Sequence, residues 1–149
     1  MFRHPLDGGP DTQVTSDGAS FSRETRDGKW LYFSRIGKET IYRMPSPSAT
    51  GLRPSPVERV LDASLRALPF GWDATSTEIF FFKMPPKQQR WAIRALSIAS
   101  GRVRFVGELG DSYADSDGMA ISVSRDGKWV YYPRLDAWSS NVVVAESAR

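Results

Sequence analysis

Hydrophobic residues in several short segments of the chain occupy consecutive positions instead of alternate ones. In the segment 128–133, KWVYYP, Trp129 and Tyr131 would point to one face of a strand, and Val130 and Tyr132 to the other. A half-buried strand carries a polar residue at every second position. We therefore expect strands that lie in sheets covered on both faces.

A sustained helical period is absent from the chain. The segment that comes closest is 55–68, SPVERVLDASLRAL, whose apolar spacing is only partly helical. Because Pro56 stands near its start and the neighbouring segments are strand-like, we expect a strand followed by a loop there.

The chain contains the same phrase twice. TRDGKWLYF at 25–33 returns as SRDGKWVYY at 124–132, with six of nine letters identical. Lys29 and Lys128 are 99 residues apart, and half of that spacing, roughly 50 residues, is about the length of one propeller blade. Midway, the segment 73–82, DATSTEIFFF, is a degenerate copy that lacks Asp-Gly. Three related hairpins are therefore expected.

Each repeat is expected to have four strands, named A to D in chain order. In the first and last copies an Asp-Gly pair would supply the positive φ of a tight turn between strands A and B. The expected ranges are 19–24, 68–73 and 119–124 for strand A; 29–34, 77–82 and 128–133 for B; 40–44, 91–96 and 141–146 for C; and 57–62 and 102–107 for D.

The N-terminus begins in the middle of a repeat. FRHP at 2–5 matches YRMP at 42–45, a strand C segment, and DTQVT at 11–15 follows as a strand D. Since repeats of about 50 residues with doubly covered strands are most simply covered by their neighbours, the pattern predicts a β-propeller.

SRDGKWVYYPR followed by SNVVVAE resembles the TolB-like propeller repeat, with Arg26 and Arg125 in place of the family's usual proline. The resemblance extends over essentially the whole chain and implies an all-β fold. It would be a partial β-propeller of about three four-stranded antiparallel blades plus the last strands of a preceding blade. The boundaries within 1–149 are 1–15 for the end of a preceding blade, 19–62 and 67–107 for two blades, and 118–147 for an incomplete last blade.

The thirteen expected strands do not close a ring, because the last blade lacks strand D while the N-terminus offers C and D together. The chain is therefore interpreted as the C-terminal part of a larger propeller or a truncated reading frame. The resemblance is closest to the C-terminal blades of large bacterial proteins, some of which join a winged-helix DNA-binding domain, a membrane helix and a propeller.

Composition narrows the classes of function. Forty per cent of the residues are hydrophobic, so a core is expected, and the absence of cysteine excludes disulfides and thiolate chemistry. The net charge of +3 comes from scattered Lys and Arg residues, so direct binding of nucleic acid is not expected. We expect no signal peptide and no membrane span within these residues. Both the periplasm and the cytoplasm therefore remain as alternatives for where the protein is located.

Catalytic and metal-binding patterns are weak. His4 is the single histidine, and GASFS at 18–22 lacks the last glycine of a nucleophile elbow. The acidic segment 111–118, DSYADSDG, departs from the EF-hand template because Tyr113 and Ser124 stand where carboxylates are needed. We expect no enzyme activity and no cofactor, with weak calcium binding as an alternative at this segment.

The candidate binding residues lie in the loops between strands B and C, which share one propeller face with the D–A loops. An exposed tryptophan among arginines and lysines is typical of a protein-binding hot spot. These residues are Arg35, Lys83, Lys87, Arg90, Arg134 and Trp138.

The expected function is a non-catalytic scaffold that binds a protein, peptide or ligand, or the upstream blades of the same propeller. The alternatives are a propeller that gates a prolyl-oligopeptidase-like hydrolase and the sensor domain of a winged-helix transcription regulator.

Overall fold

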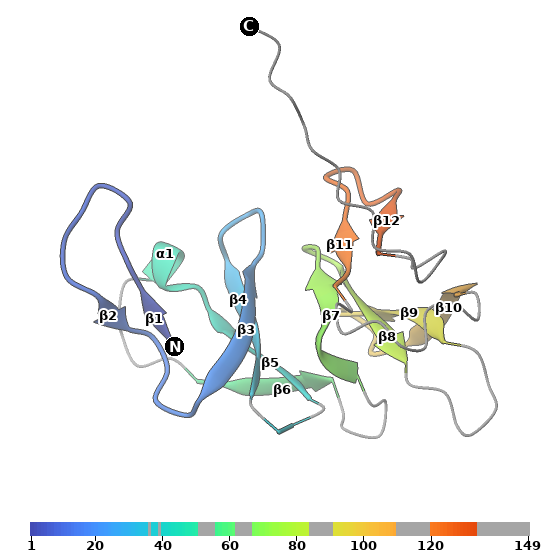
Figure 1. Cartoon of the computed structure of the whole chain (residues 1–149), viewed down its shortest axis with the longest axis horizontal. Coiled ribbons are helices and arrows are strands. Elements are labelled where there is room, and N and C mark those ends of the chain that lie inside the picture. The colour runs from blue at the N-terminus through green and yellow to red at the C-terminus, as the bar shows by residue number, and fades with distance from the viewer. Residues whose placement is uncertain are drawn as a thin grey trace, which may run out of the picture.

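The computed structural model of the chain describes residues 1–35, 37–38, 40–50, 56–61, 67–83, 91–109 and 120–133. This part is all-β apart from one short helix (Figure 1). The elements are β1 Phe2–Arg3, β2 Thr12–Gln13, β3 Ala19–Glu24, β4 Trp30–Arg35, β5 Ile41–Pro45, α1 Pro47–Thr50, β6 Glu58–Leu61, β7 Ala67–Ala74, β8 Glu78–Lys83, β9 Ala92–Ser97, β10 Val103–Glu108, β11 Ser122–Val123 and β12 Val130–Tyr131.

Strands that follow one another in the chain are paired. β3 to β6 form one four-stranded antiparallel sheet, called the first sheet, and β7 to β10 form another, called the middle sheet. β1 pairs with β2 and β11 pairs with β12, both antiparallel. The prediction of an all-β fold with four-stranded antiparallel sheets is confirmed, and the strand expected at 141–146 lies outside the described residues.

β8 of the middle sheet is buried on both faces, as its consecutive hydrophobic residues predicted. The same expectation for the segment 128–133 is wrong in the described structure, because Trp129 and Tyr131 are 66% and 60% exposed. Ile79 and Phe81 of β8 belong to the core cluster that includes Tyr32 of the first sheet. Phe80 and Phe82 point the opposite way, into a second cluster with Ile121 and Val123 from the β11–β12 hairpin. The first sheet and this hairpin therefore cover opposite faces of the middle sheet.

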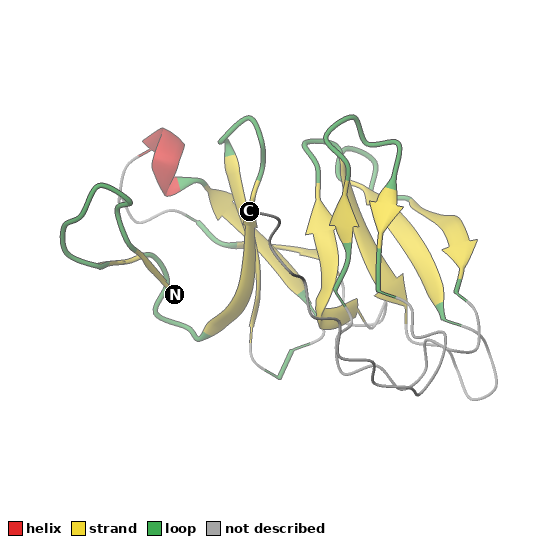
Figure 2. Ribbon diagram, turned by 45° about the horizontal axis from the view of Figure 1, so that its top comes forward, coloured by secondary structure: helices red, strands yellow, loops and turns green. Residues whose placement is uncertain are grey.

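The sheets lie side by side in an open row. β3 of the first sheet contacts β7, and β7 in turn contacts β11, so the leading strands of successive sheets are neighbours. The turns that join β3 to β4, β7 to β8 and β11 to β12 lie along the same edge of the molecule (Figure 2). The described strands thus have a consistent direction from one sheet to the next.

The first Asp-Gly turn is a four-residue connection held by side chains. The backbone pairs Thr25 with Trp30, and the Gly28 N–H donates to the Thr25 carbonyl at 2.8 Å, with Gly28 at φ 67°. The Thr25 hydroxyl accepts the Trp30 N–H at 3.1 Å and donates to the Asp27 carboxylate at 2.6 Å. The Thr25 hydroxyl and the Lys29 N–H hold the pKa of Asp27 below its ordinary value.

The second copy of the phrase forms the same turn. Ser124 replaces Thr25, accepts the Trp129 N–H at 2.9 Å and donates to Asp126 at 2.6 Å. The sequence comparison assigned the positive φ to the Asp-Gly pair but missed this hydroxyl, which comes two residues before the aspartate. Asp-Gly therefore has two separate roles: glycine adopts the left-handed backbone and the aspartate accepts hydrogen bonds.

The middle copy differs by the length of its turn. Thr75 takes the place of Thr25, since its hydroxyl accepts the Glu78 N–H at 3.0 Å and its N–H donates to the Glu78 carbonyl at 2.9 Å. Thr77 directly precedes Glu78 as Lys29 directly precedes Trp30, so the predicted match of Thr77 with Lys29 is confirmed. Two fewer residues separate the closing pair, and this deletion explains why Asp-Gly is absent.

Removing the hydroxyl of Thr25 tests the turn. Thr25→Val keeps the buried volume but leaves the Trp30 N–H without its acceptor, so we expect the free energy of unfolding to fall by about 1 kcal/mol. Urea denaturation followed by circular dichroism measures this change. Thr25→Ser is the control, because serine serves in the second turn, and equal stability of both variants would contradict the role of the hydroxyl.

Candidate functional site

The ends of β4 and β8 lie at the edge opposite the three hairpin turns (Figure 2). Arg35 ends β4 and Lys83 ends β8, so both stand where a second strand leaves its sheet. Lys38 follows Arg35 in the first of these loops, and its N–H donates to the Arg35 carbonyl at 3.1 Å. The other candidates, Lys87, Arg90, Arg134 and Trp138, lie outside the described residues.

Arg35 is held by its own fold. Its Nη2 lies 2.5 Å from Oδ2 of Asp17, which belongs to the loop between β2 and β3. The guanidinium carbon lies 4.4 Å from the centre of the Tyr42 ring, and only 26% of the side chain is exposed. The ion pair brings the two kinds of loop together at one edge, as expected, and it leaves Arg35 little freedom to bind a partner.

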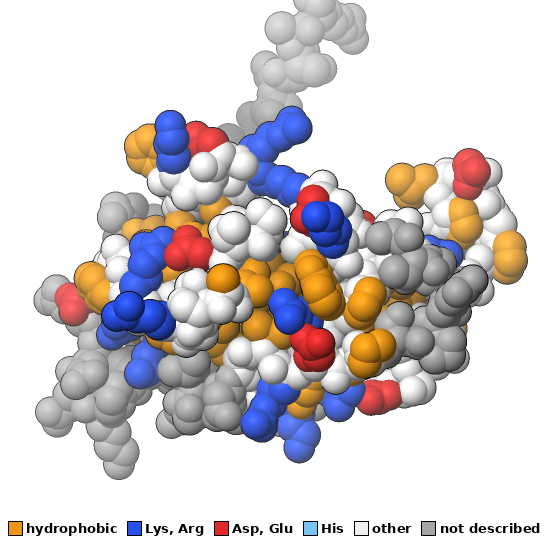
Figure 3. Space-filling view, turned by 180° about the vertical axis from the view of Figure 1, so that it is seen from behind, with side chains coloured by type: hydrophobic (Ala, Val, Ile, Leu, Met, Phe, Trp, Pro, Cys, Tyr) orange, Lys and Arg blue, Asp and Glu red, His pale blue; other side chains and the backbone are white. Residues whose placement is uncertain are grey.

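Lys38 and Lys83 differ from Arg35. Neither ammonium group has an ion-pair partner among the described residues, and Lys38 is exposed. Seen from behind, Lys and Arg side chains are spread over the surface with hydrophobic atoms between them (Figure 3). On this face the described cations form no continuous stripe of the kind that nucleic-acid binding requires.

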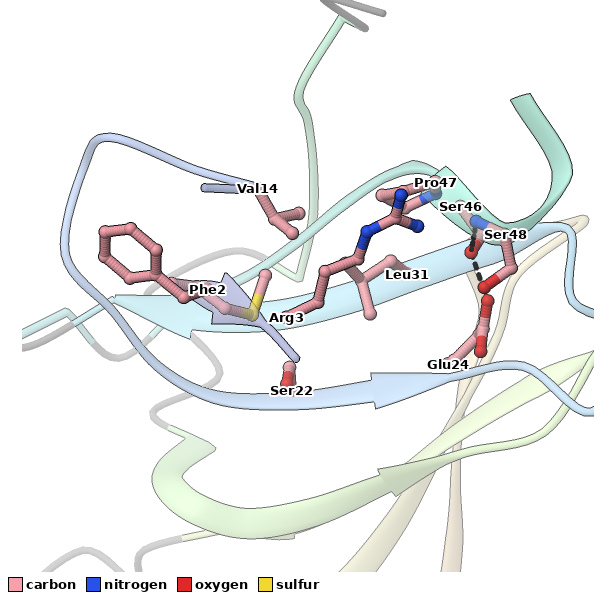
Figure 4. A pocket seen from close by; sticks show the side chains of 10 residues that line it. Phe2, Arg3, Val14, Ser22, Glu24, Leu31, Ser46, Pro47 and Ser48 are labelled. Carbon is pink, nitrogen blue, oxygen red and sulfur yellow. Dashed lines mark hydrogen bonds between the residues drawn. The ribbon is translucent and has the colours of Figure 1, made fainter. Parts of the chain in front are cut away.

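A hollow of about 160 Å³ lies between the β1–β2 hairpin and the first sheet. Phe2 and Arg3 approach it from β1, Leu31 forms part of its floor, and Glu24 and Ser46 lie at its far end (Figure 4). The buried Ser46 hydroxyl donates to the Glu24 carboxylate. The hollow thus combines an apolar floor with one free cation, since the exposed Arg3 has no ion-pair partner among the described residues.

The single histidine of the sequence pairs with an exposed aspartate. His4 Nδ1 lies 2.8 Å from Oδ1 of Asp11, and both side chains are more than half exposed. No three His, Asp or Glu side chains of the described segments are grouped as metal ligands would be. The acidic segment 111–118, where calcium binding was the alternative, lies outside the described residues.

Asp73 is a polar residue whose role the hydrophobic pattern did not reveal. Its Oδ2 accepts the Val123 N–H of β11 at 2.8 Å, and its Oδ1 lies 3.4 Å from Nε of Arg23 in β3. Arg26 Nη2 donates to the Val123 carbonyl at 3.4 Å. One carboxylate therefore links the leading strands of three successive sheets. The one signal in the sequence is an acidic residue at the end of an otherwise apolar strand.

Helices long and apolar enough to cross a bilayer are absent from the described part of the chain. In comparisons with known proteins, no family model matched the chain, and neither the curated proteins nor the solved structures gave a match.

Proposed function

We propose that the chain is part of a TolB-like β-propeller and acts as a non-catalytic scaffold, binding an acidic protein or peptide at its loop edge. The fold supports this proposal in two ways. First, the first and middle sheets have the same strand order. Second, the leading strand of each sheet contacts the leading strand of the next, β3 with β7 and β7 with β11. Propeller blades are arranged in this manner around a common axis.

The charges at the loop edge favour an acidic partner. Lys38 and Lys83 carry the proposal, because both lie at this edge and neither is neutralised by a described carboxylate. Arg35 is fixed beside them by Asp17. The remaining candidates in the sequence of these loops are three more cations and a tryptophan, namely Lys87, Arg90, Arg134 and Trp138. Cations attract an acidic partner, and an aromatic residue provides apolar contact area.

Charge reversal at this edge tests the proposal. A fluorescein-labelled peptide rich in Glu and Leu is the probe, and its binding is followed by fluorescence anisotropy at 0.05 and 0.15 M salt. The double variant Lys38→Glu, Lys83→Glu is expected to weaken binding at least tenfold, because two attractive charges become repulsive.

The matched control reverses two cations at the opposite edge. Lys29 and Arg125 both lie in the hairpin turns and are exposed, so Lys29→Glu, Arg125→Glu changes the net charge by the same amount. We expect the control to change binding less than threefold. An equal loss of peptide affinity in the two double variants would mean that only the net charge of the protein matters. This result would contradict the assignment of the binding site to the loop edge.

A further inference from the structure

Three residues of the first sheet form a unit at its contact with the middle sheet. Tyr32 is fully buried in the core cluster, and Arg43 lies directly opposite it on the neighbouring strand. The Arg43 guanidinium carbon lies 4.2 Å from the centre of the Trp30 ring. Arg43 Nε also donates to Glu58 at 2.8 Å. The aromatic pair comes from β4 and the cation from the adjacent β5.

The same unit is present at the two ends of the chain, but in separate halves. Trp129 and Tyr131 repeat the aromatic pair in GKWVY, and Arg3 repeats the cation in FRHP. Trp129 is 66% exposed and Tyr131 is 60% exposed. Arg3 is exposed as well and has no ion-pair partner among the described residues. Each half therefore lacks the other.

The hairpins that carry these halves are also complementary. β11 and β12 correspond to the first two strands of a four-stranded sheet, and β1 and β2 correspond to the last two. Within the described strands, β12 has no neighbour beyond β11, and β1 has none beyond β2. The two hairpins lie at opposite ends of the row of sheets (Figure 1), so they do not meet within one copy.

We propose that two copies of the chain associate head to tail, with β1 of each copy pairing antiparallel with β12 of the other. Each junction completes one four-stranded sheet. The described strands of one copy amount to three sheets, so those of two copies amount to six, within the range of four to eight blades of closed propellers, whereas those of three copies would amount to nine. With the described strands, two copies close the ring by two-fold symmetry. This inference rests on the propeller arrangement of the proposed function.

The register of the first sheet predicts the contacts at each junction. There Trp30 lies opposite Pro45 and Tyr32 lies opposite Arg43. By the same register, Tyr131 lies opposite Arg3 of the second copy, and the Arg3 guanidinium stacks on Trp129. A cation on a tryptophan that is withdrawn from water is among the stronger cation–π contacts.

The hollow beside Arg3 provides the space for these rings. Leu31 in its floor occupies the position in β4 that Ile79 occupies in β8, and Ile79 packs in the cluster that contains Tyr32. Tyr131 of the second copy would thus share a cluster with Leu31, as Tyr32 shares one with Ile79. Figure 4 shows that Arg3 extends along this hollow.

Residues 141–146 of the same chain are the competing neighbour of β12, since they were expected to form a strand there. This segment, NVVVAE, contains no arginine or lysine. It offers no cation of the kind that stacks on Trp30 in the first sheet. Arg3 of a second copy provides a cation for both Trp129 and Tyr131. The edge of β12 is therefore assigned to β1 of that copy.

Light scattering coupled to size-exclusion chromatography measures the mass of the full chain. We expect twice the 16.7 kDa of one copy at micromolar concentrations. Arg3→Ala and Trp129→Ala should each weaken the dimer about a hundredfold, because each substitution affects both junctions. Arg3→Ala removes the cation of the cation–π contact and of a charged hydrogen bond, and Trp129→Ala removes the ring on which that cation stacks. Both residues are exposed in one copy, so folding should persist; Arg102→Ala, which removes another exposed arginine, should leave the mass unchanged.

Mixing the two variants provides the sharpest test. In a mixed dimer one junction combines the intact Arg3 with the intact Trp129, and the other junction receives both defects. Two variants that are monomeric alone should therefore associate when mixed. A chain shortened after residue 140 should still dimerise.

A mass of 16.7 kDa at all concentrations would overturn the inference, and so would open chains that lengthen with concentration or a dimer lost on removing residues 141–149. A monomer that still binds the acidic probe through Lys38 and Lys83 would overturn the assembly alone and leave the proposed function standing. A dimer whose binding of the acidic probe is weakened equally by charge reversal at either edge would overturn the proposed binding site and leave the assembly standing.

Discussion

Replacing Trp72 by alanine is expected to remove most of the stability of the chain. The Trp72 side chain is fully buried in the cluster between the first and middle sheets, and its ring meets Phe21 edge to face at 5.2 Å. Removing a buried tryptophan costs roughly 3–5 kcal/mol, and domains of this size unfold with about 5–15 kcal/mol. The urea midpoint should therefore fall by roughly 2 M, measured by tryptophan fluorescence and circular dichroism.

Phe70 in the same strand is the matched control. It is 56% exposed and meets Phe21 at 6.2 Å, so Phe70→Ala removes an aromatic side chain without opening a cavity in the core. We expect the midpoint of this variant to fall by less than a third of the loss in Trp72→Ala. Similar midpoints for the two variants would contradict the view that the two sheets are joined through Trp72.

The strands could be predicted from the sequence because burial on both faces leaves a clear pattern. EIFFF has no polar residue at alternate positions, and in the structure Phe80 and Phe81 enter different core clusters. The matching phrases at 25–33 and 124–132 then located the hairpins, since each turn needs a residue at positive φ, which glycine adopts readily. Patterns of this kind report on local backbone and burial.

What the sequence did not reveal depends on contacts between distant segments. The position of Asp73 in its strand says nothing of Val123, 50 residues away, which it binds. Likewise, the sequence marked Arg35 as a binding residue because it is a cation in a loop. Its ion pair with Asp17 and its stacking on Tyr42 appear only when the loops are placed in space.

Substituting Asp73 by alanine is expected to loosen the last hairpin while leaving the first sheet intact. The carboxylate is mostly buried, and its side chain is 13% exposed. Its loss leaves the Val123 N–H without an acceptor and Arg23 without its ion-pair partner. Hydrogen bonds to charged groups contribute about 1.5–3 kcal/mol, whereas the half-exposed ion pair with Arg23 adds little.

Amide hydrogen exchange measures this effect residue by residue. Exchange at Val123 should become at least tenfold faster in Asp73→Ala, because among the described residues only apolar packing and the contact from Arg26 then hold β11 to its neighbouring sheets. Exchange in β4 should not change. Asp73→Asn keeps an oxygen acceptor for Val123 and should recover most of the protection. If Val123 exchanged equally fast in both variants, the ion pair with Arg23, and not the hydrogen bond, would be what holds the hairpin to the middle sheet.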